Sequence, residues 1–205
     1  MTASTYLYER QSEYWTSRQI EEFFFDRGFS VTTLPIPQGV EKLLPADFVF
    51  SADSFIKIFG LQFKALYRSE EDYWAITKHQ HDRLQKYRWI YYGLSEMKNA
   101  VEYRSALHWC RFVDANFPYQ EKLYMSGANR LKSYRKWAAF YESLAGCSRG
   151  ERVNSALHLR DLFMAGQDDP RLERLARAAA DVFLVDFNNR ATVHYSPLMR
   201  NFEGQ

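Results

Sequence analysis

The fold is decided by two neighbouring apolar stretches, Leu44-Pro45-Ala46-Asp47-Phe48-Val49-Phe50 and Phe55-Ile56-Lys57-Ile58-Phe59-Gly60-Leu61-Gln62-Phe63-Lys64. Both stretches are rich in aromatic and β-branched residues and a short polar turn separates them, which predicts adjacent β-strands. Asp47 opens the first run. Gln62 and Lys64 stand two residues apart on the second, so their side chains share one face of the strand.

This combination of side chains suits metal-assisted hydrolysis. A carboxylate oxygen from Asp47 and an amide oxygen from Gln62 are ligands that a hard cation such as Mg²⁺ accepts. A neighbouring lysine, Lys64, can orient water or steady the charge that develops on a phosphate. The alternative is an ordinary antiparallel hairpin in which Asp47 and Lys64 pair on a solvated face.

The same residues resemble the PD-(D/E)xK nuclease superfamily, whose restriction-endonuclease-like fold also occurs in Holliday-junction resolvases and in the endonuclease subunits of some transposition systems. The motif reads Pro45-Ala46-Asp47 and then Gln62-Phe63-Lys64, and the resemblance covers roughly residues 10–115. One residue is inserted between the proline and the acid, and Gln62 replaces the usual Glu or Asp. Transposition-type endonucleases also tolerate this glutamine. We expect a lower metal affinity, because an amide offers a dipole where a carboxylate offers a full charge.

The resemblance implies a DNA endonuclease that depends on Mg²⁺ or Mn²⁺. Asp47 and Gln62 would ligate the metal with the carbonyl oxygen of Phe63, and Lys64 would position the attacking water. In the family, the first helix often contributes a glutamate that completes the metal site. The candidates in this chain are Glu13, Glu21 and Glu22, and the sequence does not choose among them.

The order of predicted elements favours an α/β fold with a restriction-endonuclease-like mixed sheet flanked by helices. Around the two central strands, we expect a helix from Glu9 to Arg27 that stops at Gly28, a strand from Val31 to Leu34, a helix within residues 73–88, a strand from Trp89 to Leu94, a short helix from Asn99 to Ser105 and a strand from Ala106 to Val113. This order is also that of the nuclease family.

The second part of the chain changes to helical patterns. They span Leu131–Ala145, Glu151–Ala165 and Pro170–Phe187, and a short strand is predicted from Arg190 to Tyr195. We therefore expect a nuclease-like core over residues 1–117 and an α-helical C-terminal extension over 118–205. No Gly/Ser-rich or Pro-rich linker separates the two parts, so the sequence favours one continuous domain.

Two groups of polar residues are candidates for contact with nucleic acid. Lys78, His81, Gln85 and Arg88 recur at steps of three and four residues and would form one stripe on a helix. In the extension, Arg130, Lys132 and Arg135 interleave with Tyr134 and Trp137, and such cations and aromatic rings can bind phosphates and stack on bases. Both patterns also occur on ordinary amphipathic helices whose charges are solvated.

The composition limits the classes to which the protein can belong. The chain has 205 residues, of which 46% are hydrophobic, so it can bury a sizeable core, and its net charge of +2 excludes a strongly basic coat. Two cysteines are too few for a disulfide framework and no apolar run approaches the roughly 20 residues of a membrane span, so we expect a cytoplasmic protein without a membrane partner. Cleavage of both DNA strands would require two sites, which suggests a homodimer or a partner protein.

Two other functions compete with the endonuclease. The first is a catalytically weak or inactive nuclease-fold module that binds nucleic acid or protein, for which Gln62 is the main argument. The second is a helical interaction protein in which the motif is accidental. Convergence of Asp47, Gln62 and Lys64 in space would favour the nuclease scaffold over the interaction protein.

Overall fold

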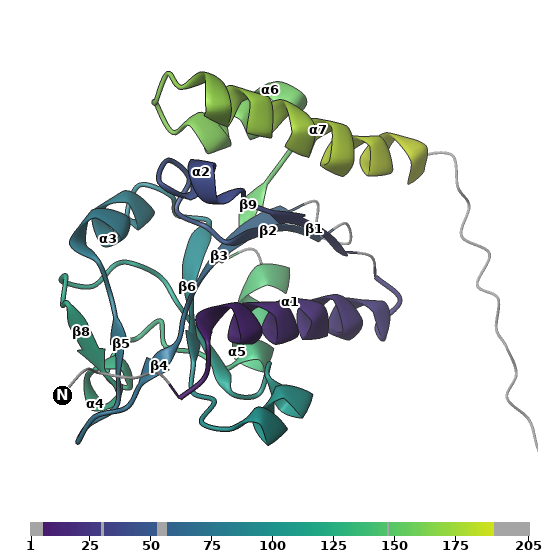
Figure 1. Ribbon diagram of the computed structural model, residues 1–205. Helices are drawn as coiled ribbons and strands as arrows, with labels where there is room; N and C mark the ends of the chain where they lie inside the picture. The colour runs from purple at the N-terminus through teal and green to yellow at the C-terminus, as the bar shows by residue number, and fades with distance from the viewer. Residues whose placement is uncertain (1–5, 30, 53–56, 147, 191–205) are drawn as a thin grey trace, which may run out of the picture.

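Strand β3 (Lys57–Lys64) lies at the centre of a mixed sheet in the computed structural model, which describes residues 6–29, 31–52, 57–146 and 148–190 (Figure 1). The strand order is β1 (Val31–Pro35), β2 (Phe48–Ala52), β3, β6 (Ile90–Ser95) and β7 (Cys110–Val113), and β9 (Glu151–Arg152) pairs with the start of β3. β3 runs parallel to β6 and antiparallel to β2 and β9. The two central strands predicted from the sequence are therefore confirmed.

One face of the sheet is covered by α1 (Glu9–Phe25) and α5 (Trp137–Ala145). Alternate residues of β3, among them Phe59 and Phe63, point to this face and pack with Phe24 of α1. The first helix forms as predicted and stops just before Gly28, whose φ of +72° is the left-handed conformation that ends many helices.

The opposite face carries three helices, α3 (Lys78–Leu84), α6 (Ala156–Met164) and α7 (Pro170–Arg190). In Figure 1, α6 and α7 lie above β1 and β2, whereas α1 lies below them. The α/β class and the mixed sheet flanked by helices are thus confirmed. Within the described residues, no helix combines the length and the apolar character needed to cross a membrane.

A second, three-stranded sheet follows the end of β3. It consists of β4 (Leu66–Tyr67), β5 (Tyr73–Ala75) and β8 (Lys122–Tyr124), with α4 (Met125–Ala128) after it. The helix predicted within residues 73–88 is therefore only partly correct, because its first residues form β5. Trp74 is fully buried there and its indole N–H donates to the Ser95 carbonyl oxygen at 2.7 Å, a tertiary contact that the local pattern does not contain.

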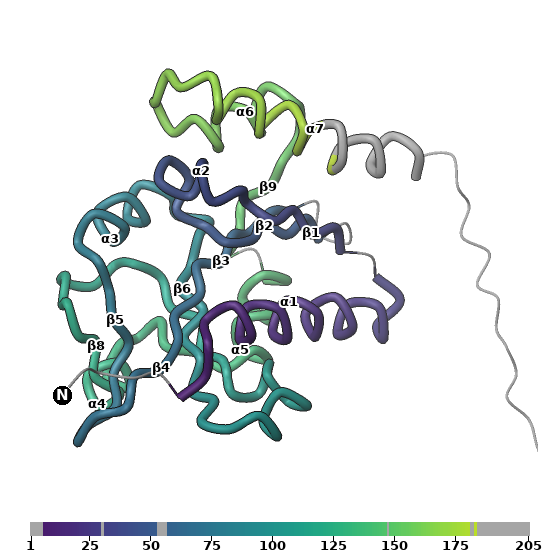
Figure 2. Tube along the Cα trace, in the orientation of Figure 1, coloured from purple at the N-terminus to yellow at the C-terminus, as the bar shows by residue number. Residues whose placement is uncertain are grey.

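Between the two sheets the chain follows the path traced in Figure 2, from β5 through α3 into β6. The short helix predicted at residues 99–105 is a 3₁₀ helix, η2 (Ala100–Ser105). A further one-turn helix, α2 (Gln38–Glu41), precedes β2.

The second half of the chain is less helical than predicted. α5 begins at Trp137 and not at Leu131, because the backbone of Arg135 exchanges hydrogen bonds of 2.9 and 3.2 Å with Phe112 of β7. The start of the predicted helix over 151–165 forms β9, and β8 joins the second sheet. Residues after 117 therefore supply a strand to each sheet. α7 confirms the last predicted helix, and residues 191–195 of the predicted terminal strand lie outside the described residues.

Candidate active site

Asp47 lies immediately before β2 and its carboxylate meets the end of β3. The side-chain Nε2 of Gln62 donates to both carboxylate oxygens at 2.9 and 2.8 Å, and the backbone N–H of Phe63 donates to Oδ2 at 2.6 Å. The backbone of Asp47 is fixed by Leu61 and Ile36, through hydrogen bonds of 2.8 Å on each side. The structure thus brings together the acid and the amide that the sequence selects.

Gln62 contains an unsatisfied polar atom. The residue is 3% exposed, and its Oε1 has no hydrogen-bond partner among the described residues. Leaving a buried amide oxygen unpaired costs about 1–3 kcal/mol. Rotating the amide would turn this oxygen toward the Asp47 carboxylate, an arrangement that a cation between the two groups would stabilise.

The two side chains lie at ordinary hydrogen-bond distance, which is also the separation of neighbouring oxygens bound to one Mg²⁺. Octahedral Mg²⁺ holds oxygens at about 2.0–2.1 Å, which places neighbouring ligand oxygens about 2.9 Å apart. The terminal amide atom of Gln62 lies 2.8 and 2.9 Å from the Asp47 oxygens. The carbonyl oxygen of Phe63 is a third possible metal ligand. The N–H and C=O of one strand residue point to the same strand edge, and the N–H of Phe63 points at Asp47. These residues therefore fit a hard divalent ion.

Glu13 is the helix glutamate that interacts with Asp47. Burial, reinforced by the negative charge of Glu13, raises the pKa of Asp47 to about 8. Burial, reinforced by Glu9, raises the pKa of Glu13 to about 7, and burial also raises the pKa of Glu41. Partly buried carboxyl groups that raise one another's pKa are common where a cation or a proton acts in function.

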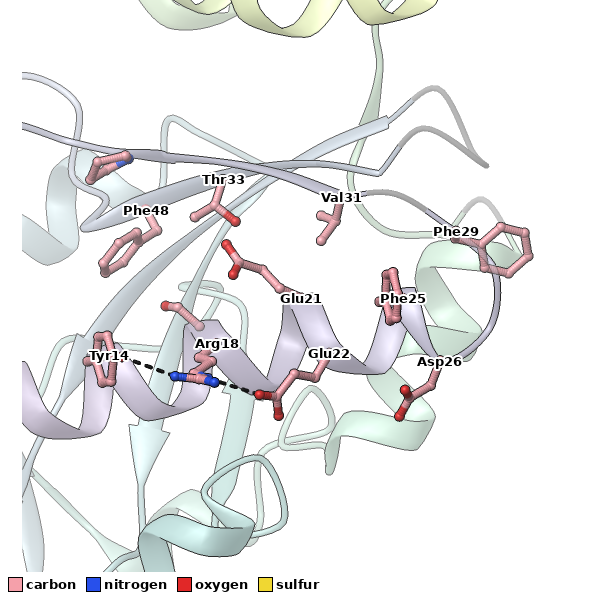
Figure 3. A pocket seen from close by; sticks show the side chains of 12 residues that line it. Tyr14, Arg18, Glu21, Glu22, Phe25, Asp26, Phe29, Val31, Thr33 and Phe48 are labelled. Atoms are coloured by element: carbon pink, nitrogen blue, oxygen red, sulfur yellow. Dashed lines mark hydrogen bonds and ion pairs between the residues drawn. The ribbon is translucent and has the colours of Figure 1, made fainter. Parts of the chain in front are cut away.

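Glu21 and Glu22 lie farther along α1, away from Asp47. Glu21 is eight residues from Glu13, about 12 Å along the helix axis. Both side chains are exposed and line a groove of about 870 Å³ between α1 and β1 (Figure 3). In this groove Glu22 pairs with Arg18 at 2.9 Å, and Glu21 points toward Thr33. Of the three candidate glutamates, the structure therefore places only Glu13 near Asp47.

Lys64 has a partner that the sequence analysis missed. Its Nζ lies 3.5 Å from Oε1 of Glu9, while Oε2 of Glu9 accepts a hydrogen bond of 3.1 Å from the N–H of Ala65. Glu9 precedes Glu13 by four residues and so lies on the same helix face, a spacing that could have identified it. Glu9 fixes the direction of the lysine.

The acidic groups alone do not form a metal centre. In the part of the chain that the structure describes, no group of three or more His, Cys, Asp or Glu side chains is arranged to hold a metal ion. A cation at this site would depend on the oxygens of Gln62 and Phe63 in addition to carboxylates.

The expected polar stripe after β5 does not form one exposed surface. His81 is 1% exposed, with its ring nitrogens 3.2 Å from the Tyr92 hydroxyl and 2.9 Å from the Phe117 carbonyl oxygen, so it belongs to the core. Lys78 is exposed and pairs with Asp82 at 2.8 Å. The remaining two residues lie beyond α3: Gln85 donates to the Ala115 carbonyl oxygen at 3.1 Å, and Arg88 is exposed just before β6.

The second group of basic residues is exposed but does not lie on a helix. Arg130, Lys132 and Arg135 belong to the segment between α4 and α5. The interleaved aromatic residues point inward, since Trp137 is 5% exposed and Tyr134 donates its hydroxyl hydrogen bond to Glu96. The cations can contact phosphates, whereas these two rings are occupied by the core.

Comparison of the chain with protein-family models, with curated proteins and with solved structures gave no match.

Proposed function

We propose that the protein is a metal-dependent nuclease with a restriction-endonuclease-like fold that hydrolyses phosphodiester bonds of DNA. The observation that carries this proposal is the meeting of Asp47, Gln62 and Phe63 at the end of β3, one residue from Lys64. The order of elements supports it as well, because α1, the antiparallel strands β1 to β3, α3 and then β6, parallel to β3, occur in the order of that family, with α2, β4 and β5 inserted among them.

The residues divide into ligands and positioning groups. Asp47, the Gln62 oxygen, the Phe63 carbonyl oxygen and Glu13 would hold Mg²⁺ or Mn²⁺. The bound cation supplies Lewis-acid polarisation of the phosphate. Lys64 would orient the attacking water and offset the charge that develops on the phosphate, and Glu9 would position the lysine.

The runner-up function is a non-catalytic module that keeps the nuclease scaffold and binds nucleic acid or protein. Two observations favour it. The Gln62 amide hydrogen-bonds both carboxylate oxygens of Asp47, and no group of three His, Cys, Asp or Glu side chains is arranged to hold a metal ion among the described residues.

The test is a cleavage assay on single-stranded, duplex and branched DNA and on RNA, with Mg²⁺, Mn²⁺ or EDTA. We expect cation-dependent cleavage that falls about 10²–10⁴-fold in Asp47→Asn, which weakens the metal shell, and in Lys64→Met, which removes the group that orients the attacking water. Glu22→Gln is the matched control on α1, since this exposed carboxylate pairs only with a neighbouring turn. It should cleave like the wild type.

The outcome that favours the runner-up is a folded protein that binds nucleic acid in EDTA but cleaves no substrate with either cation. Cleavage that survives Asp47→Asn would exclude the site altogether.

A further inference from the structure

The opposite end of β3 borders a basic cavity that the proposed nuclease activity does not use. It has a volume of about 370 Å³. Its lining includes four cationic residues, Lys57, Arg88, Arg149 and Arg152, against one acidic residue, Glu151. Because β3 and β6 are parallel, their first residues lie at the same end of the sheet, which brings the residues beside Lys57 and Arg88 together.

The loop that carries Arg149 is held in a fixed conformation. Gly150 has a φ of +68°, and a Cβ there would approach the Ile58 carbonyl oxygen to 3.0 Å, so a side chain at this position would be strained. The N–H of Gly150 donates to the Tyr91 hydroxyl at 2.9 Å. The buried Lys57 ammonium donates to the carbonyl oxygens of Leu144 and Arg149 at 2.7 and 3.0 Å. The cavity wall is therefore preorganised.

Arg149 is a buried cation whose bonding capacity is not filled. Its side chain is 10% exposed and its guanidinium lies 5.1 and 5.4 Å from the rings of Tyr91 and Phe140. Nη2 lies 3.6 Å from Asp114, a long ion pair, and Nη1 is buried with no hydrogen-bond partner in the described part of the chain. A buried guanidinium normally has its donors paired, so this arrangement favours a bound anion.

We propose that this cavity binds a phosphate group, carried either by a free nucleotide or by the end of a nucleic-acid strand. A phosphate has enough oxygens to accept from the guanidinium of Arg149 and from Arg88 at the rim together, and the guanidinium fork matches its geometry. Even with Asp114 counted beside Glu151, cations exceed carboxylates around the cavity, which favours a dianion over a single carboxylate.

The phosphate site is separate from the candidate active site. Lys57 and Lys64 are seven residues apart on an extended strand, which corresponds to about 23 Å. Changes at Arg149 or Arg88 therefore leave Asp47 and Gln62 in place. The proposal stands without the nuclease activity, and its test needs no cleavage.

The experiment is calorimetric titration of the full chain, in EDTA, with inorganic phosphate, a nucleoside 5′-monophosphate, and one oligonucleotide with either a 5′-phosphate or a 5′-hydroxyl. We expect Arg88→Gln and Arg149→Gln to weaken phosphate binding at least about tenfold each, the loss of one charge-assisted hydrogen bond. Arg104→Gln, an exposed arginine on η2, and Asp47→Asn should bind like the wild type.

Two arms identify the source of the phosphate. Tighter binding of the 5′-phosphorylated oligonucleotide than of the 5′-hydroxyl form, lost in Arg149→Gln, assigns the site to a strand end. Equal binding of the two oligonucleotides beside tight binding of the monophosphate assigns it to a free nucleotide. Because Arg88 is exposed, Arg88→Gln keeps the test valid if Arg149→Gln does not fold. Absence of phosphate binding by the wild type, or equal effects of Arg88→Gln and Arg104→Gln, would overturn the proposal.

Discussion

Lys57 and Lys64 stand at the two ends of the same strand, and their surroundings differ. Lys57 is 2% exposed and its ammonium donates to two backbone carbonyl oxygens at 2.7 and 3.0 Å. Lys64 has a looser ion pair, 3.5 Å from Glu9, beside a glutamine with an unpaired oxygen and two carboxyl groups whose pKa values are raised by burial.

Lys57 therefore contributes to the stability of the fold, whereas the polar groups around Lys64 are available for chemistry. Buried polar groups in folded proteins are nearly always satisfied, and one that lies beside carboxyl groups with raised pKa values is a candidate for binding a ligand. The acidic end of β3, where Asp47 and Glu13 lie, therefore lowers the stability of the free protein, and the proposed cation would restore it.

Paired substitutions of the two lysines should give the largest difference in stability. Lys57→Met keeps the length of the side chain but leaves the Leu144 and Arg149 carbonyl oxygens without their donor. We expect the free energy of unfolding to fall by about 3 kcal/mol. Lys64→Met should change it by less than about 1 kcal/mol, since its ion pair is partly solvated. Urea denaturation measures both, and equal losses would remove the contrast between the two ends.

The acidic end should also show an unusual dependence of stability on pH. Asp47 has a pKa of about 8 in the folded protein against an ordinary value of 3.8, so between these values the folded state binds more protons than the unfolded chain. The free energy of unfolding in EDTA should therefore fall as the pH rises from about 4 to about 8, by up to about 1.4 kcal/mol per pH unit. Glu13 acts in the same direction up to about pH 7.

Asp47→Asn is the control for this titration. Its side-chain amide can donate to the unpaired Oε1 of Gln62 and carries no charge, so the loss of stability toward pH 8 should shrink. Chemical denaturation at pH 5, 7 and 9 measures the slope. A mutant with the same slope as the wild type would show that Asp47 is not the titrating group.

Gln62→Glu increases the difference between the two ends of β3, because it adds a negative charge beside Asp47. A carboxylate of the same reach adds a charged oxygen ligand, so we expect Mg²⁺ or Mn²⁺ affinity to rise about tenfold. Without metal, the same change should lower stability at pH 8 because it adds repulsion to Asp47. Calorimetric titration with metal tests the first effect, and unchanged affinity would place Gln62 outside the metal shell.

The smallest effect on stability is expected at the exposed cations before α5. Joint neutralisation of Arg130, Lys132 and Arg135 to glutamine should weaken binding of all DNA sequences similarly and reduce the slope of log affinity against log salt by about 2–3. The free energy of unfolding should change by less than about 0.5 kcal/mol. The matched control neutralises three exposed arginines of α7, Arg171, Arg174 and Arg177. Identical slopes for both triple mutants and the wild type would exclude this surface from DNA binding.

The parts of the fold that the sequence predicts are those whose pattern is local. β2 and β3 are short runs rich in aromatic and aliphatic residues, and α7 repeats apolar residues at helical spacing, so each pattern is sufficient by itself. β5 and the two-residue β9 depend on partners far along the chain. Their local sequences do not contain the pairing that defines them.

The same distinction holds for the candidate site. Pairing of two strands brings Asp47 beside Gln62, and this follows from the sequence. The selection of Glu13 over Glu21 and Glu22 depends on where α1 crosses the end of the sheet, and the burial of His81 depends on Tyr92 and Phe117. A helical spacing of polar residues is the same whether the histidine faces solvent or the core.

The pairing of β9 with the first two residues of β3 has a consequence for how the chain folds during synthesis. Lys57 and Ile58 are translated more than ninety residues before their partners Arg152 and Glu151. Until that segment leaves the ribosome, the central strand has an unpaired stretch and a buried lysine without acceptors. Contacts of such long sequence separation slow folding. We therefore expect the nascent sheet to close late, with β3 available to other chains or to chaperones in the meantime.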